Sequence, residues 1–274
     1  MGIKRDYSQS ATRKLFGWVR GQSKKVKVGL GIMLTLISLA AMVVLGRYGS
    51  LLFVAAESVH AVGILVLAYK LIKHKSCSGL SLKSQELTAI FLTARLVSSF
   101  TTEANIHTAL DIASLLSTAW IIYMMRFRLK ATYMKKQDTV ALYYTVAPSI
   151  ILAILIHPHA FHYSFFSMLW AFCVYMETVS VLPQLRMIQN AKMIEPFTAH
   201  YVFALGVARF LSFANWIYRI YMTRGAYFFL IGYGYLWLPT AILAEFVQTF
   251  ILADFCYYYI KSYMEGQIVM MMPV

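Results

Sequence analysis

The residues best suited to chemistry in this chain are basic side chains placed inside an apolar stretch. His200–Arg224 (HYVFALGVARFLSFANWIYRIYMTR) is long and apolar enough to span a bilayer. At 100° per residue, one face of a helix there, within an arc of roughly 120°, carries Arg209, Ser212, Asn215, Trp216 and Arg219. A charged side chain inside a membrane is costly unless it faces protein or a water-filled cavity. This face therefore predicts a polar interior that binds an anionic partner.

Other apolar stretches also contain ionisable residues, which are Glu57, His60, Arg95, Glu177, Glu245 and Asp254. The arginines Arg95, Arg209 and Arg219 outnumber Glu177, and guanidinium groups suit bidentate capture of carboxylates. With Trp216 beside them, they predict a site for a small acidic ligand or a peptide C-terminus. For the remaining acidic residues, structural ion pairs or positions near the membrane interface are the alternative interpretation.

The composition indicates an all-α polytopic membrane protein. The chain has 274 residues, of which 60% are hydrophobic and 13% charged, and its mean hydropathy is +0.64. The net charge is +14, and the basic residues lie in short segments between apolar runs. This distribution favours positive cytosolic loops over a nucleic-acid partner. Cys77, Cys173 and Cys256 have no metal-ligand spacing, and no phosphate loop or nucleophile motif is present. We therefore predict no catalytic site, no metal site, no cofactor and no enzymatic activity.

The apolar spans position these candidates and number about eight: Val28–Leu45, Leu51–Lys73, Ser84–Phe100, Ile106–Arg126, Thr139–His157, Tyr163–Leu182, Thr198–Met222 and one within Leu236–Ile260. We interpret the first as a retained helix because no cleavage site of small residues follows it. Basic connections alternate with nearly uncharged ones, which predicts that both termini are cytosolic. The pair Pro183-Gln184 predicts a break in the sixth span at the cytosolic side.

From about Leu52 to Tyr263 the chain resembles the ER lumen protein-retaining receptors, also called KDEL/HDEL receptors. The matching blocks are CSGLS from Cys77 continuing through Lys83-Ser84-Gln85, KATY from Lys130, YMETVSVLPQ from Tyr175, Thr198 through Arg219, and Val247-Gln248-Thr249 with Asp254-Phe255. The resemblance implies a seven-helix bundle similar to SWEET and PQ-loop transporters, with one extra N-terminal transmembrane helix. The expected organisation is a basic cytosolic arm (1–27), the extra helix (28–45), the seven-helix domain (51–263) and a cytosolic tail (264–274).

The resemblance also implies a function and a location. Members bind C-terminal KDEL/HDEL-type tetrapeptides of luminal proteins in the Golgi and return them to the endoplasmic reticulum by vesicle-mediated retrograde transport. The expected location is therefore the membranes of these two compartments. The expected partners are the tetrapeptide, membrane lipid, and components of the COPI and COPII coats.

Individual roles follow from matching positions. Arg95 matches the arginine that takes the terminal carboxylate of the peptide, Arg219 a second ligand arginine, and Trp216 the tryptophan that packs on the signal. The polar core positions of the family fall on Asn215, Arg209 and Glu177. The family position for pH sensing falls on His60, and the one for recycling falls on Asp254.

Other positions depart from the family pattern. The arginine that reads the acidic side chain of the signal falls on Phe53, two carboxylates on Ser98 and Ser167, and the tyrosine partner of the histidine on Ala208. The tail also lacks the family's lysine cluster. Carboxylate capture is thus retained while signal selectivity is altered. Two alternatives stay open. One is a family member that no longer binds the standard signal. The other is a SWEET/PQ-loop-like transporter of solutes or organic anions, which the Pro-Gln break and an arginine-lined cavity would suit.

Overall fold

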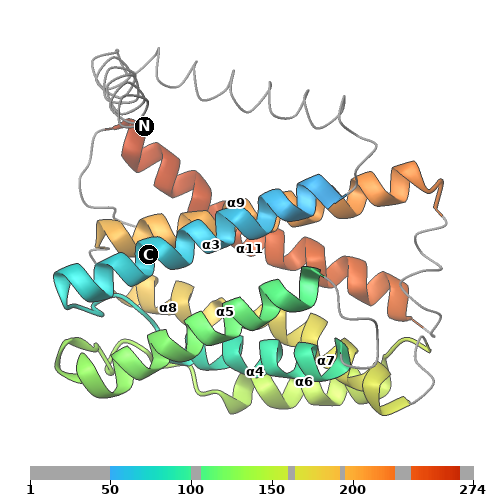
Figure 1. Cartoon of the computed structure of the whole chain (residues 1–274), viewed down its shortest axis with the longest axis horizontal. Helices are drawn as coiled ribbons and strands as arrows, with labels where there is room; N and C mark the ends of the chain where they lie inside the picture. The colour runs from blue at the N-terminus through green and yellow to red at the C-terminus, as the bar shows by residue number, and fades with distance from the viewer. Residues whose placement is uncertain (1–49, 100–105, 160–163, 192–194, 226–235, 266–274) are drawn as a thin grey trace, which may run out of the picture. The chain divides into compact units, whose positions relative to one another are not determined.

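The computed structural model describes residues 50–99, 106–159, 164–191, 195–225 and 236–265 (Figure 1). The helices from Leu52 onward belong to one compact unit, and the described residues contain helices and connections but no strand. The basic arm (1–27), the predicted first helix (28–45) and all but the first two residues of the predicted tail lie outside the described residues.

The helical elements follow the apolar spans closely. In chain order they are α3 (Ser50–Tyr69), the π-helical turn η1 (Lys70–His74), α4 (Leu82–Ser99), α5 (Ile106–Tyr123), the π-helical turn η2 (Met124–Arg128), the 3-10 turn η3 (Lys130–Thr132), α6 (Tyr143–Leu155), α7 (Ser164–Val179), α8 (Leu182–Asn190), α9 (Pro196–Met222) and α11 (Trp237–Met264). Each of the seven spans predicted from Leu51 onward coincides with one of these helices within a few residues.

Several helices are long and apolar enough to cross a membrane. Within the described residues they are Leu51–His74, Ser164–Asn190, Pro196–Met222 and Trp237–Met264, and α6 is a shorter apolar helix. Their outward faces carry many exposed large apolar side chains, such as Leu65, Leu155 and Phe250, which are stable only against lipid or another protein. The chain is therefore an all-α polytopic membrane protein, as its composition predicted.

Two glycines allow helices to approach closely. A side chain at Gly63 of α3 would place its Cβ 3.0 Å from the Cβ of Ala204, so α3 and α9 approach closely at this point. A Cβ at Gly206 would collide with the sulfur of Cys256, so α9 lies equally close to α11. The other principal contacts join α4 to α5 and α7, α6 to α7, and α7 to α11. Together they place one face of each helix toward a shared interior.

At one end of the helices, polar side chains join connections that are far apart in the sequence. Gln184 accepts a hydrogen bond from the amide of Ser81 (2.9 Å) and donates to the carbonyl of Gly79 (2.8 Å). Asp138 accepts from the hydroxyls of Ser81 (2.9 Å) and Tyr133 (2.6 Å). Burial and the adjacent Asp138 carboxylate raise the pKa of Tyr133. These contacts bring together three sequence blocks that carried the family resemblance.

Lys70 completes this network, which we call the basic-end junction and define as Lys70, 77–85, 130–138, Gln184 and 195–198. The Lys70 side chain is fully buried, and its Nζ donates to the carbonyl of Ser78 and the hydroxyl of Thr198, each at 2.6 Å. Nζ also lies 2.8 Å from Oε2 of Glu195, as an ion pair outside hydrogen-bond geometry. The two buried charges here, Lys70 and Asp138, therefore both have partners on another segment.

The predicted break at Pro183-Gln184 lies in this region. The chain turns at Ser180 and Val181, and Pro183 then occupies the first turn of α8, where its missing N–H is not needed. The Gln184 side chain forms the two hydrogen bonds just described. The Pro-Gln pair is thus explained by a helix junction and gives no support to the transporter alternative.

Candidate ligand-binding site

Arginine and carboxylate side chains from four helices meet inside the bundle. Arg95 of α4 donates to Asp111 of α5 through two nitrogens, Nε to Oδ2 at 3.1 Å and Nη2 to Oδ1 at 2.5 Å. Its Nη1 lies 3.4 Å from Oε1 of Glu177, on α7. The same Glu177 oxygen accepts a hydrogen bond from Arg209 of α9. We call Arg95, Asp111, Glu177 and Arg209 the ion cluster.

The members of the ion cluster are largely shielded from solvent. Their side chains are exposed by 28% for Arg95, 22% for Arg209, 13% for Glu177 and 12% for Asp111. The ring of Phe91 lies under the Arg95 guanidinium, 5.6 Å from its Cζ, in a position that allows cation–π attraction. Charges inside a membrane bundle need such partners, and these side chains supply them to one another.

Further ionisable groups surround the ion cluster. His60 of α3 interacts electrostatically with Arg209, Glu177 and Arg95. Glu57 stands one turn earlier on the same helix and interacts with both arginines, as does Glu245 of α11. The structure therefore places His60 within electrostatic range of Arg95, Glu177 and Arg209.

Asn215 on α9 contains a buried polar atom without a partner. The residue is 6% exposed, and within the described part of the chain its Oδ1 accepts no hydrogen bond. A buried acceptor left unsatisfied costs free energy, so such atoms occur where a ligand or water is bound. Asn215 thus presents a free acceptor inside the described part of the bundle.

Trp216 and Arg219 extend this face of α9 away from the ion cluster. Trp216 is half-buried and packs against an aromatic group that includes Tyr175 and the fully buried Trp237. Arg219 is also half-buried and lies in the last turn of α9. It follows Arg209 by ten residues, which is about 15 Å along the helix axis. The α9 face is therefore extended, with arginines at two separate levels.

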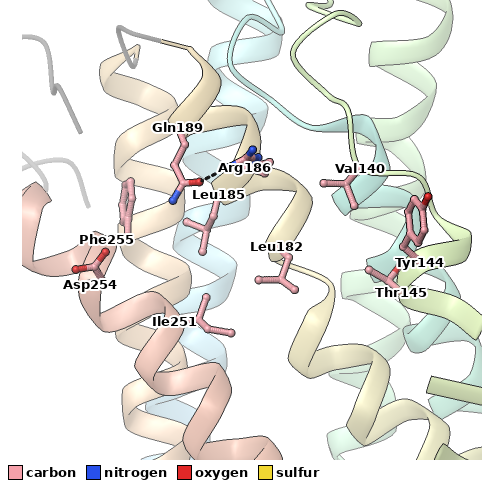
Figure 2. A pocket seen from close by; sticks show the side chains of 10 residues that line it. All are labelled: Val140, Tyr144, Thr145, Leu182, Leu185, Arg186, Gln189, Ile251, Asp254 and Phe255. Atoms are coloured by element: carbon pink, nitrogen blue, oxygen red, sulfur yellow. Dashed lines mark hydrogen bonds between the residues drawn. The ribbon is translucent and has the colours of Figure 1, made fainter. Parts of the chain in front are cut away.

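Asp254 lies apart from the other predicted site residues. It is exposed on α11 and lines a separate pocket of about 440 Å³, together with Arg186 and Gln189 of α8 and Tyr144 of α6 (Figure 2). Among the described residues, neither Asp254 nor Arg186 forms an ion pair, and Arg186 contacts Gln189 through one hydrogen bond. Asp254, for which the resemblance predicts a recycling role, thus lies apart from the candidate ligand site.

The departures from the family pattern are mostly buried small residues. Ser98, Ser167 and Ala208 are less than 8% exposed, and Phe53 is half-buried. The Ser98 hydroxyl donates to the backbone carbonyl of Arg95 at 2.8 Å. Ser98 therefore forms a local helix contact where the family pattern has a carboxylate.

Asp111 is the site residue that sequence reasoning missed. It stands alone as a carboxylate inside the apolar span Ile106–Arg126, and that isolation was a signal that could have identified it. No family role falls on this position in the resemblance, so nothing drew attention to it. Because Asp111 pairs with Arg95, the arginines of the interior have more acidic partners than Glu177 alone, which was the one counted from the sequence.

The fold and the site together define a class: a polytopic helical membrane protein whose interior holds paired arginines and carboxylates beside a half-buried tryptophan. Comparison with known proteins is more specific. The profile of the ER lumen protein retaining receptor family matches residues 76–219. The chain belongs to this family.

Curated relatives match over most of their own length. ER lumen protein-retaining receptor erd-2.2 of Caenorhabditis elegans is 37% identical over 222 residues, which is 81% of this chain and 98% of that protein. A receptor of Caenorhabditis briggsae is 38% identical over 214 residues, 78% of this chain and 94% of its own. Receptor B of Arabidopsis thaliana is 36% identical over 216 residues, with the same two shares.

Proposed function

We propose that this protein is a retention receptor that binds the C-terminal signal of luminal proteins and returns them to the endoplasmic reticulum. The observation that carries the proposal is the position of Arg95 in a chain of this family. Its guanidinium is held inside the bundle, at the position that takes the peptide carboxylate in the family resemblance, and it is partly accessible. A guanidinium in a shielded interior binds a carboxylate more strongly than one in water.

The geometry of α9 suits an extended peptide. The axial distance from the level of Arg209 to that of Arg219 is about 15 Å, and four extended residues span roughly 13 Å. The terminal carboxylate would lie on Arg95, and a backbone N–H would donate to the unsatisfied Oδ1 of Asn215. Trp216 would pack on the apolar residue of the signal, and Arg219 would contact its N-terminal part.

Binding would respond to luminal pH through His60. This histidine interacts electrostatically with Arg209, Glu177 and Arg95, which belong to other helices. A change in its charge alters the electrostatic balance at Glu177, which holds both arginines. Histidine is the side chain that titrates between the pH of the Golgi and that of the endoplasmic reticulum.

Selectivity for the standard signal would be reduced at Phe53. An apolar ring replaces the arginine that reads the acidic side chain of the signal in the family resemblance. A desolvated contact between charged groups contributes roughly 2–5 kcal/mol, so its loss lowers affinity by about one to three orders of magnitude. We therefore expect peptides without that acidic side chain to compete well with KDEL or HDEL.

The basic-end junction would face the cytosol. Exposed basic residues gather on the connections at this end, including Lys73, Lys75, Arg126 and Arg128, as positive-inside topology requires. The termini would then be cytosolic and the ligand site would open to the lumen. Components of the COPI and COPII coats, and membrane lipid, are the partners proposed for this side, near the pocket at Asp254.

The test is binding of a labelled peptide to the full-length protein in detergent at pH about 5.5 and about 7.4. We expect saturable binding of a peptide ending in HDEL or KDEL at the acidic pH, and at least a hundredfold loss in Arg95→Ala. Arg126→Ala is the matched control, because Arg126 is an exposed arginine in η2, outside the ion cluster. Absence of binding at both pH values would reject the proposal and leave a family member that does not bind the standard signal.

A further inference from the structure

Asp111 holds Arg95 in the geometry by which a protein arginine captures a carboxylate ligand. Two parallel contacts, Nε to Oδ2 at 3.1 Å and Nη2 to Oδ1 at 2.5 Å, join one edge of the guanidinium to both carboxylate oxygens. This bidentate arrangement is the strongest and most specific one available to the pair. The site proposed for the peptide carboxylate is thus already occupied by a carboxylate of the chain itself.

The second bidentate edge of Arg95, formed by Nη1 and Nη2, is shared between the two acids. A guanidinium has five N–H groups; Asp111 takes two, and Nη1 faces both oxygens of Glu177 at 3.4 and 3.5 Å. Both nitrogens of that second edge therefore already donate to an acid. A ligand carboxylate at either edge competes with Asp111 or with Glu177 for Arg95, and it is also repelled by both of their negative charges.

The contacts of the two acids decide which of them can leave. Glu177 accepts hydrogen bonds from both Arg95 and Arg209, so its displacement would leave two arginines with fewer partners. Asp111 has Arg95 as its single hydrogen-bond partner within the described residues. Losing the Asp111 contact therefore disturbs one arginine, which the incoming carboxylate would satisfy again.

We infer that Asp111 is an internal competitor: it occupies the bidentate edge of Arg95 in the unliganded protein and is displaced by the C-terminal carboxylate of the peptide. This inference rests on the proposed function for the identity of the ligand. Peptide affinity then reflects an exchange of one carboxylate for another. Because Asp111 competes for Arg95, a peptide binds only if its contacts outside the carboxylate are favourable enough. Asp111 is therefore a determinant of specificity.

The principal test compares Asp111→Asn with the wild type, using peptides with a free and with an amidated C-terminus. The asparagine keeps the size of the side chain and removes its charge, so Arg95 becomes available. We expect at least tenfold tighter binding of the free-acid peptide and less than a twofold change for the amidated one. Asp254→Asn is the matched control, because Asp254 is exposed outside the ion cluster, and it should leave both affinities unchanged.

A second test needs no peptide. In Asp111→Ala, added formate should enter the vacated place beside Arg95 and raise the melting temperature by on the order of 2 °C over chloride of equal ionic strength. The wild type and the double variant Arg95→Met/Asp111→Ala should show no such difference. This readout separates the exchange site from peptide recognition.

The outcomes are distinct. Tighter binding in Asp111→Asn supports the competitor, even if the wild type itself binds no peptide. Formate rescue without peptide binding by any variant supports the exchange site and rejects the proposed peptide ligand. Unchanged or weaker binding of the free-acid peptide in Asp111→Asn, or no response to formate in Asp111→Ala, overturns the inference and makes Asp111 a structural partner of Arg95.

Discussion

The basic-end junction and the ion cluster both bury charged groups, yet they satisfy them in different ways. In the junction, Lys70 and Asp138 each have three partners, which are backbone or side-chain groups and lie mostly on other segments. In the ion cluster, charged side chains pair with one another, and Asp111 contacts Arg95 as its one hydrogen-bond partner among the described residues. Nearby, the Oδ1 of Asn215 has no partner in that part of the chain.

This difference separates a structural use of charge from a binding use. A charge with several partners on several segments fixes those segments, because any change leaves a buried group unsatisfied. A charge with one exchangeable partner can accept a ligand without disturbing the fold. We therefore expect substitutions in the junction to affect stability, and those in the ion cluster and on the α9 face to affect ligand affinity.

The largest effect is expected for Lys70→Met in the basic-end junction. Removing the ammonium leaves Glu195 without its ion pair and the Thr198 hydroxyl without its donor, and the Ser78 carbonyl keeps only the longer hydrogen bond from Thr198 (3.4 Å). Breaking such a buried pair should lower the free energy of unfolding by about 3–5 kcal/mol. The measurement is thermal and denaturant unfolding in detergent. Lys73→Met is the control, because Lys73 is exposed three residues later; equal stability of the two variants would contradict the structural role.

A smaller effect is expected for the contact between Tyr133 and Asp138. Tyr133→Phe removes a hydrogen bond to a carboxylate and should cost roughly 2 kcal/mol. In a double-mutant cycle with Asp138→Asn, the two losses should not add, because they remove the same contact. Additive losses would show that the phenol and the carboxylate act independently.

The same contact predicts a dependence on pH. Burial and the Asp138 carboxylate raise the pKa of Tyr133 above that of a free phenol. Its contribution to stability is therefore complete below pH about 10 and is lost as the pH rises above that value. Unfolding curves between pH about 9 and 11 should show this loss in the wild type but not in Tyr133→Phe.

The smallest effect on stability is expected for Asn215→Leu, which should nevertheless weaken peptide binding. Removing an unsatisfied buried acceptor should leave the free energy of unfolding unchanged or raise it by about 1 kcal/mol. Peptide affinity should fall about tenfold, because one ligand N–H loses its acceptor. A clear loss of stability with unchanged affinity would place Asn215 with the structural residues of the junction.

Much of the fold could be predicted from the sequence because apolar runs of membrane length have few alternatives to helix. The interior position of Arg95, Glu177 and Arg209 followed from charges inside those runs. Lys70 and Lys73 look alike in the sequence, and tertiary packing alone buries one and exposes the other. The pairing of Asp111 with Arg95 depends on how α5 lies against α4, and no local pattern encodes that contact.

Asp254 shows the opposite limit. Its position in an apolar span left a structural ion pair and a place near the membrane interface both open, and it lies exposed beside a pocket at α8 and α11. When a helix is apolar on most sides, the sequence around an acidic residue does not show whether that residue is buried in the bundle or exposed on its surface. Only the arrangement of neighbouring helices distinguishes them.

The central claim is that Arg95 binds the terminal carboxylate of a peptide ligand. It is tested most directly by a cycle that combines Arg95→Ala with amidation of the peptide C-terminus, with affinity measured at pH about 5.5. If the two groups contact each other, Arg95→Ala alone should weaken binding by at least a hundredfold and amidation alone by at least tenfold. Both changes together should weaken it hardly more than Arg95→Ala does. Independent losses that multiply, or equal affinity for the free-acid and amidated peptides in the wild type, would contradict it.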